Sequence, residues 1–121
     1  GKAFALTGDI DKHSKCQCCH PAQPIRPDIV WFGEVPMGME RIHAAIDALQ
    51  HGDVCLVVGT SGHVHPAAGI AAAARSVGAT TVLVNLDAPV NVDDFDEVHL
   101  GLAGDVLPGL VDAWLREWSD A

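Results

Sequence analysis

The stretch 53–77 constrains the fold more than any other part of this 121-residue chain. Asp53–Val58 is apolar and β-branched, as a strand buried on both faces requires. A Gly59-Thr60-Ser61-Gly62 turn follows, and Pro66 then opens a helix that we expect to run to Val77. In an open α/β sheet, ligands bind at the carboxyl end of such a strand, although a tight connection without a ligand has the same pattern. The turn is therefore a candidate ligand loop.

The rest of the chain alternates in the same way. We expect strands at Asp28–Phe32, Thr80–Asn85 and Glu97–Leu100, helices at Met37–Gln50 and Asp105–Trp118, and a loop at Pro89–Asp94. Strands and helices in alternation predict an α/β fold with a parallel sheet and right-handed crossovers. Residues 1–27 show no convincing periodicity and hold several turn signals, so we expect a separate small module at 1–27 and the α/β domain at 28–121.

The charge of the chain is acidic and uneven. The net charge is -9, with an excess of two positive charges in residues 1–26 and of eleven negative charges in the remainder. An acidic body argues against nucleic acid as a partner, because phosphate contacts need a basic face. No apolar run approaches the roughly 20 residues that span a bilayer. We therefore expect no nucleic acid and no membrane partner, and a cytoplasmic location. Because the chain starts at Gly1 and not at Met, we expect it to be a piece of a longer one.

Three of the four cysteines lie in the cluster Cys16-Gln17-Cys18-Cys19. Cys16 and Cys19 have the spacing of half a structural zinc site, because two thiolates can hold one edge of a tetrahedron. The second pair of ligands is expected upstream of Gly1. Free thiols and a redox pair are the alternatives, although prolines follow and no strand precedes, which disfavours a redox motif. The other nearby donors have poor spacing for a closed site: His13, Cys18 and His20.

Three predicted strand ends meet at one edge of the sheet. They are the turn 59–61, the segment Asn85-Leu86-Asp87 and the turn 101–104. Backbone N–H groups of the first could hold a phosphate, and Asn85 or Asp87 could accept a hydrogen bond from a ribose hydroxyl. Together they suggest a nucleotide along this edge, although the Gly-x-Gly-x-x-Gly fingerprint is absent. His63 and His65 flank the loop, but no acid is placed to orient either, so we expect neither to be catalytic.

These segments match a known family. Arg26–Glu34, Gly59–Ala68 and Asn85–Asp87 resemble, in order, the sirtuins, and among them the bacterial NAD-dependent protein deacylases. The resemblance implies a Rossmann-like NAD-binding domain portion at 28–121 and a partial zinc-binding module at 1–27. It implies transfer of an acyl group from acyl-lysine to ADP-ribose with release of nicotinamide, with NAD and zinc as cofactors and acylated lysine in proteins as the substrate.

The resemblance also assigns roles to individual residues. The cofactor-binding set would be Gly59, Thr60, Ser61, Asn85, Leu86, Asp87 and Ala103. The set that grips the acyl-lysine peptide as an added strand would be Val30, Phe32, Gly33, Glu34 and Val64. Such a clamp is physically sensible, because an extended peptide satisfies loop backbone groups without reading much sequence. Cys16 and Cys19 would be the second zinc pair.

The chain departs from the family pattern at its start. The glycine-rich pyrophosphate loop, the Gln-Asn-x-Asp segment, the catalytic histidine and the first cysteine pair of sirtuins precede the zinc module, and none is in this chain. We therefore assign no catalytic residue. We expect a C-terminal portion that is inactive alone and has the missing N-terminal half as its partner. The alternatives are a non-catalytic nucleotide-binding or interaction module and, more weakly, a zinc-ribbon adaptor built on Cys16 and Cys19.

Overall fold

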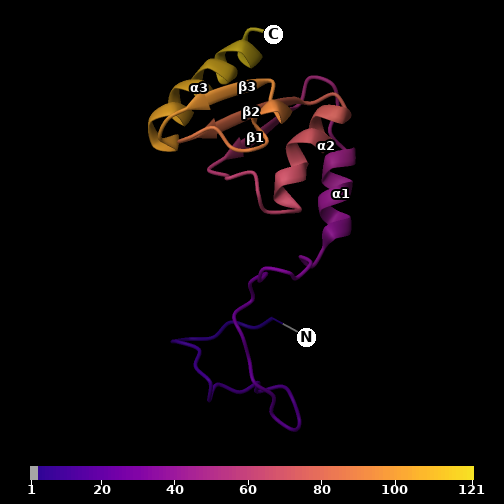
Figure 1. Cartoon of the computed structure of the whole chain (residues 1–121), viewed down its shortest axis with the longest axis vertical. Helices are drawn as coiled ribbons and strands as arrows, with labels where there is room; N and C mark the ends of the chain where they lie inside the picture. Colours follow the sequence, from indigo (N-terminus) through magenta and orange to yellow (C-terminus); the bar gives the residue numbers. More distant parts are fainter. Residues whose placement is uncertain (1–2) are drawn as a thin grey trace. The chain divides into compact units, whose positions relative to one another are not determined.

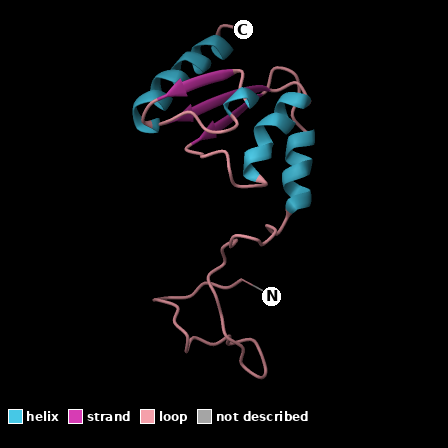
Figure 2. Cartoon of the chain, in the orientation of Figure 1, coloured by secondary structure: helices cyan, strands magenta, loops and turns pink. Residues whose placement is uncertain are grey.

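The computed structural model describes residues 3–121, in two compact units, Gly1–Met37 and Gly38–Ala121 (Figure 1). The helices and strands of the described residues all belong to the second unit (Figure 2). In chain order they are α1 (Met39–Asp47), β1 (Val54–Val58), η1 (Ala67–Gly69), α2 (Ile70–Ser76), β2 (Thr80–Asn85), η2 (Val92–Asp94), β3 (Glu97–Leu100) and α3 (Ala103–Ser119).

The three strands form a parallel sheet in the order β1-β2-β3. Its register places Leu83 of β2 between Val57 of β1 and Val98 of β3. Within this unit the sheet lies between α3 and the pair formed by α1 and α2 (Figure 1). The predicted α/β fold with parallel strands is therefore confirmed, because each crossover contains a helical or 3-10 segment that carries the chain back to the start of the next strand.

The core is centred on β2. Val82, Leu83 and Val84 are fully buried, because β2 has a strand on either side and helices over both faces. Leu83 packs with Ala71 of α2 and with Phe95. Alanines on the inner face of α2 let the helix approach the sheet closely, as the alanine-rich sequence of this segment predicts.

The helix ends differ from the predicted ones by a few residues. α1 begins after Gly38, whose φ of 78° is left-handed, and ends three residues before the predicted Gln50. The segment that begins at Pro66 starts as the 3-10 turn η1 before becoming α2. α2 ends in a Schellman motif in which Gly78 has φ +96° and Ala79 N–H donates to Ala74 O at 3.2 Å. Gly78 is thus the predicted cap.

A polar network joins α2, β2 and the segment before β3. Thr81 is fully buried, and both its N–H and its hydroxyl donate to Asp96 Oδ2 at 2.9 and 3.0 Å. The other carboxylate oxygen of Asp96 pairs with Arg75 Nε at 3.0 Å. These hydrogen bonds hold the pKa of Asp96 below its ordinary value, with a smaller contribution from the Arg75 charge. The network supplies partners for a polar group inside the core.

The described part of Gly1–Met37 contains only turns, bends and one antiparallel bridge, between Lys15 and Pro24. The prediction of a strand at Asp28–Phe32 is wrong. The run is apolar and rich in β-branched residues, but its side chains are half-exposed or more, with Phe32 at 94% exposure. A turn closed by Glu34 N–H on Trp31 O at 3.0 Å replaces the strand. Local side-chain bonds, described below, hold the backbone in this turn and away from a ladder.

Candidate functional site

The carboxyl ends of the three strands lie side by side, as the parallel register requires. Gly59 N–H donates to Val84 O at 3.1 Å and Gly101 N–H donates to Asn85 O at 2.8 Å, so the ladder continues one step beyond each strand. The turns that follow β1, β2 and β3 are therefore neighbours at one edge of the sheet. This is the edge at which open α/β sheets bind ligands.

Asn85 ties two of these turns together. Its side-chain amide donates to Thr60 O at 2.8 Å and to Asp87 O at 2.6 Å. Both N–H bonds of the amide are thereby used to fix backbone, which leaves its carbonyl oxygen as an acceptor. Leu86 and Asp87 beyond it are exposed. The sequence predicted an acceptor at this position but gave no sign of the tie to Thr60.

The loop after β1 is folded back on itself by its hydroxyls. Thr60 Oγ1 accepts from Gly62 N–H at 3.2 Å, and Ser61 Oγ accepts from His63 N–H at 3.4 Å. These are side-chain turns in which the hydroxyl replaces a backbone carbonyl. Within residues 3–121, the N–H groups of Thr60 and Ser61 have no acceptor. Two donors of neighbouring residues are therefore free at the strand end.

Asn91 packs against this loop, and the sequence analysis did not identify it as part of the site. Its amide donates to Ala68 O at 3.0 Å, while its Oδ1 is buried and has no partner among the described residues. The buried Gly62 lies against that oxygen, with φ +74°, and a Cβ there would collide with Asn91 Oδ1. The sequence signal for this packing is only the second glycine of the turn, which does not name its neighbour.

The third turn leads into α3. Ala103 is the first residue of this helix and is half-buried, behind Leu102, which precedes the helix. Leu86, Leu100 and Leu102 are all well over half-exposed. Leucines at a strand-end edge leave apolar surface that a flat ring could cover. The sequence analysis named Leu86 and Ala103, and included Leu102 in the turn 101–104, but did not name Leu100 as a site residue.

The residues assigned to the peptide clamp lie in both units. Val30, Phe32, Gly33 and Glu34 belong to Gly1–Met37, whereas Val64 belongs to Gly38–Ala121. Val30 and Val64 are each about half-exposed, at 54% and 51%. Val64 O accepts from Ala68 N–H at 2.8 Å, which fixes the start of η1. The apolar side chains of this set are therefore available to a partner.

Glu34 is already engaged. Its two carboxylate oxygens accept from Arg26 Nη1 and Nη2 at 2.6 and 2.8 Å, and Trp31 N–H donates to Oε2 at 3.3 Å. These hydrogen bonds lower the pKa of Glu34 to about 2, and the bonds from Arg26 make the largest contribution. A carboxylate with so many donors remains ionised through the neutral range.

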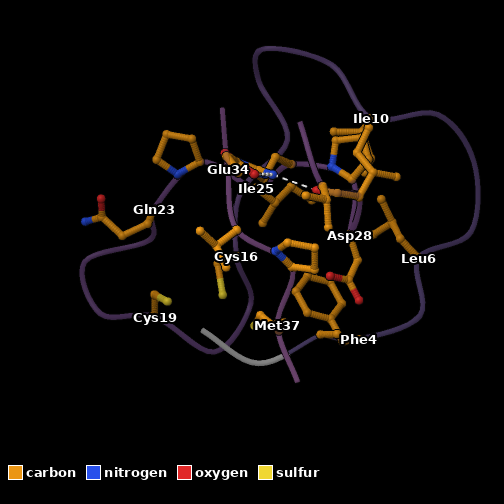
Figure 3. A pocket seen from close by; sticks show the side chains of 18 of the residues that line it. Phe4, Leu6, Ile10, Cys16, Cys19, Gln23, Ile25, Asp28, Glu34 and Met37 are labelled. Carbon is orange, nitrogen blue, oxygen red and sulfur yellow. Dashed lines mark hydrogen bonds and ion pairs between the residues drawn. The ribbon is translucent and has the colours of Figure 1, made fainter. Parts of the chain in front are cut away.

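Cys16 and Cys19 lie together beside a hollow of about 820 Å³ in the first unit (Figure 3). Cys18 N–H donates to Cys16 Sγ at 3.4 Å, and Cys16 N–H donates to Gln23 O at 2.7 Å. A hydrogen bond between the two thiols lowers the pKa of Cys16 and raises that of Cys19. Two adjacent thiols fit half of a tetrahedral zinc site. The described residues hold no group of three or more His, Cys, Asp or Glu that could complete it.

The histidines next to the loop have no orienting acid. His63 and His65 are exposed, and neither ring is hydrogen-bonded to a carboxylate within the part of the chain that the structure describes.

None of the helices over residues 3–121 has the length and apolarity needed to cross a membrane.

The sequence matches the Sir2 family over residues 2–66, and the chain belongs to that family. It is 46% identical over 114 residues to an NAD-dependent protein deacylase of Shewanella oneidensis, covering 94% of this chain and 46% of the relative. It is 42% identical over 116 residues to one of Salmonella typhimurium, covering 96% and 41%. The chain thus spans less than half the length of these relatives.

Solved structures show the same similarity. A Sir2 homologue in complex with ADP-ribose matches with a TM-score of 0.81 and 28% identity, over 96% of this chain and 46% of that one. A Sir2 homologue in complex with NAD matches with a TM-score of 0.74 and 30% identity, over 86% and 40%. A Sir2 protein bound to a myristoylated histone peptide matches with a TM-score of 0.68 and 29% identity, over 89% and 45%. The fold is therefore that of the Sir2 Rossmann-like domain.

Proposed function

We propose that this chain forms the nucleotide edge and part of the peptide clamp of an NAD-dependent protein lysine deacylase. The whole protein would transfer an acyl group from acyl-lysine to ADP-ribose and release nicotinamide. Membership of the Sir2 family and similarity to relatives named NAD-dependent protein deacylase support the reaction class. Because the chain spans less than half of those relatives, the catalytic base would come from outside residues 1–121.

The observation that carries the proposal is the set of three turns at the carboxyl edge. The free N–H groups of Thr60 and Ser61, next to Gly59, would donate to phosphate oxygens of NAD. Asn85 and Asp87 offer acceptors to a ribose hydroxyl, and Leu86 and Ala103 offer apolar surface to the adenine. When bound, NAD supplies the ribose carbon that accepts the acyl oxygen.

The substrate side of the proposal rests on the exposed clamp residues. Val30 and Phe32 of the first unit present exposed apolar side chains to an acylated peptide segment, with Gly33 in the same loop. Val64 of the second unit is exposed as well and keeps the role that the Sir2 resemblance implies for it. An acyl-lysine carries no charge on its side chain, so burying its stem against apolar residues has no desolvation penalty for an ammonium group. Glu34 belongs to the same loop. A complex of one similar Sir2 protein with a myristoylated histone peptide supports an acylated peptide as the class of substrate.

We also propose zinc as a structural cofactor, with Cys16 and Cys19 as two of its four ligands. In the complete protein, changing either to serine should remove the bound zinc and lower the melting temperature, because structural zinc stabilises folding directly. Cys18→Ser is the matched control, since Cys18 is exposed and its N–H donor to Cys16 Sγ belongs to the backbone, which the substitution leaves in place. Loss of zinc in the Cys18 variant alone would contradict the assignment.

A chimera tests the activity. This chain would replace the matched 114-residue segment of the Shewanella oneidensis deacylase. We expect NAD-dependent deacetylation of an acetyl-lysine peptide by the chimera and none by residues 1–121 alone. Asn85→Ala should raise the KM for NAD about tenfold and that for the peptide little, since the tie between two nucleotide turns is lost. Turnover by the isolated chain would show that the base lies within it and would contradict the proposal.

A non-catalytic nucleotide-binding or interaction module is the second candidate. It is favoured by the same edge in a chain where, among the described residues, neither His63 nor His65 beside the loop is hydrogen-bonded to a carboxylate. Calorimetric titration of the isolated chain with ADP-ribose separates the two. Tight binding by residues 1–121 together with an inactive chimera would favour the module, whereas an active chimera favours the deacylase.

A further inference from the structure

Two charged side chains close the segment 26–34 into a loop. The Arg26 fork meets both carboxylate oxygens of Glu34, at 2.6 and 2.8 Å. Arg26 Nη2 also donates to Ile29 O at 2.7 Å, and Trp31 N–H donates to Glu34 Oε2 at 3.3 Å. The Arg26 guanidinium lies over the Trp31 ring, with Cζ 4.3 Å from its centroid. The pair thus fixes both the ends and the interior of the loop, and we call it the Arg26–Glu34 clasp.

Apolar residues of the loop are exposed while the clasp is closed. Phe32 is 94% exposed although it is fully apolar, and Val30 is half-exposed. A flexible loop with this composition would fold its phenylalanine onto other apolar surface, since burial of an aromatic ring is favourable. Because the backbone on both sides of Phe32 is tied, the ring is held in solvent. Such preorganisation lowers the entropy lost when a partner binds.

We propose that Arg26 and Glu34 are positioning residues that hold Phe32 and the backbone near Val30 ready for the acylated peptide. This inference rests on the proposed function and deepens it. Glu34 then acts through the clasp and not by contact with the substrate, because three donors within the loop already occupy most of the roughly four acceptor sites of its carboxylate. Arginine is the residue that can make this contact, since its planar fork meets both oxygens while its face stacks on an aromatic ring.

The kinetic test uses the chimera described above. Glu34→Gln should raise the KM for an acetyl-lysine peptide about tenfold, the size expected for loss of a charge-assisted bond, and should leave the KM for NAD within about twofold. Arg26→Lys keeps the charge but loses the guanidinium fork, so its KM for the peptide should lie between that of the unchanged chimera and that of Glu34→Gln. The double variant R26K/E34Q should have a KM for the peptide no higher than that of Glu34→Gln, because both substitutions break the same clasp. Additive effects would overturn the proposal.

Matched controls separate the clasp from general effects of charge. Glu40→Gln removes a carboxylate at the first turn of α1, and Arg116→Lys changes a guanidinium near the end of α3. Neither Glu40 nor Arg116 forms an ion pair within residues 3–121, and both variants should leave the peptide KM unchanged. The charge swap R26E/E34R should recover part of the loss, because the ion pair returns but Trp31 N–H and Ile29 O lose their partners. A swap no better than Glu34→Gln would overturn the proposal.

A measurement without turnover separates this proposal from the proposed function. The backbone amide and indole signals of Trp31, in NMR spectra of residues 1–121, should shift in both clasp variants and remain in place in both controls. The affinity of a fluorescent acetyl-lysine peptide for the chimera, measured by anisotropy, should fall with Glu34→Gln.

The outcomes of the two measurements are distinct. An inactive chimera that still binds the peptide would contradict the proposed deacylase activity, and the clasp variants would then still test the role of the clasp in peptide binding. If Glu34→Gln weakens peptide binding but leaves the Trp31 signals in place, Glu34 contacts the peptide directly. If the Trp31 signals shift but the affinity for the peptide is unchanged, the clasp has no role in peptide binding. Either result overturns the proposal, as does an absence of peptide binding.

Discussion

At the scale of single residues, the candidate site depends on groups whose partners are distant in sequence. Gly62 has a left-handed backbone and no room for a Cβ, because Asn91 fills the space beside it. Glu34 is ionised and bound because Arg26 lies across the loop from it. In both cases the residue type was visible in the sequence, but its reason was not.

Gly62→Ala should destabilise the chain. The new Cβ would collide with Asn91 Oδ1, and a left-handed backbone is unfavourable for alanine, so we expect a loss of about 1–3 kcal/mol in the free energy of unfolding. Urea denaturation followed by circular dichroism measures this loss. Gly104→Ala in α3 is the control, because a Cβ at Gly104 meets open space and alanine favours a helix. Equal midpoints for Gly62→Ala and the unchanged chain would contradict the prediction.

The clasp should survive mild acid. The folded pKa of Glu34 is lowered to about 2 from an ordinary value of 4.5, so its stabilisation is fully present above the ordinary value and is lost as the pH falls through the lowered one. The Trp31 amide signal should therefore titrate with a midpoint near the lowered value. Arg26→Gln should move this midpoint upward, towards the ordinary pKa. A midpoint already at the ordinary value in the unchanged chain would mean that the clasp does not form.

At the scale of elements, β2 organises the second unit. It is the central strand, its apolar residues are fully buried, and its buried Thr81 bonds to the segment that leads into β3. The last two residues of β2 align the ends of the neighbouring strands. Gly59 N–H after β1 donates to Val84 O, and Gly101 N–H after β3 donates to Asn85 O. The edge at which we propose nucleotide binding is therefore held in place by β2 and its polar network.

Thr81→Val tests this network. The valine has the same shape but lacks the hydroxyl, whose one hydrogen is within reach of Asp94 O and Asp96 Oδ2 and whose oxygen accepts from Asp96 N–H. Asp94 O loses this donor, while Asp96 keeps its bonds to the backbone of residue 81, and we expect a loss of about 1–3 kcal/mol in the free energy of unfolding. Thr80→Val in the same strand is the control and should be nearly neutral. Thermal and urea unfolding of the two variants give the comparison, and equal stabilities would contradict the assigned role.

At the scale of the whole molecule, β1 is an edge strand of the sheet formed by the described residues. Its Leu56 and Val58 are more than a third exposed on one face. An apolar edge with unpaired backbone groups favours association.

The isolated chain should consequently self-associate as its concentration rises. Leu56→Lys should shift the sedimentation profile towards the monomer, because a lysine on an edge strand opposes pairing. Val77→Lys places the same charge at an equally exposed valine after α2 and should leave the association unchanged. Circular dichroism confirms that both variants stay folded. Monomeric behaviour of the unchanged chain at all concentrations would contradict the prediction.

The sequence by itself determined the strands of the sheet, their parallel arrangement and the glycine turns, because hydrophobic period and turn chemistry are local properties. β2 and β3 have the predicted bounds, and Gly78 ends α2 as predicted. Helix ends shifted by a few residues, since capping depends on the local backbone angles. The strand predicted at Asp28–Phe32 is wrong because β propensity needs a neighbouring strand to pack against, and the described residues pair none with this segment, which ends in the turn from Trp31 to Glu34.

The tertiary structure alone decided which polar groups are used and which are free. Asn85 holds the turn at Thr60, Asn91 fills the space beside Gly62, and Asp96 satisfies the buried Thr81. Each pair joins residues that are 15 to 29 positions apart, so no local pattern indicates it. Burial is the physical reason, because a polar group taken out of water must find a partner in the folded chain, and only the packing of the elements determines which partner is within reach.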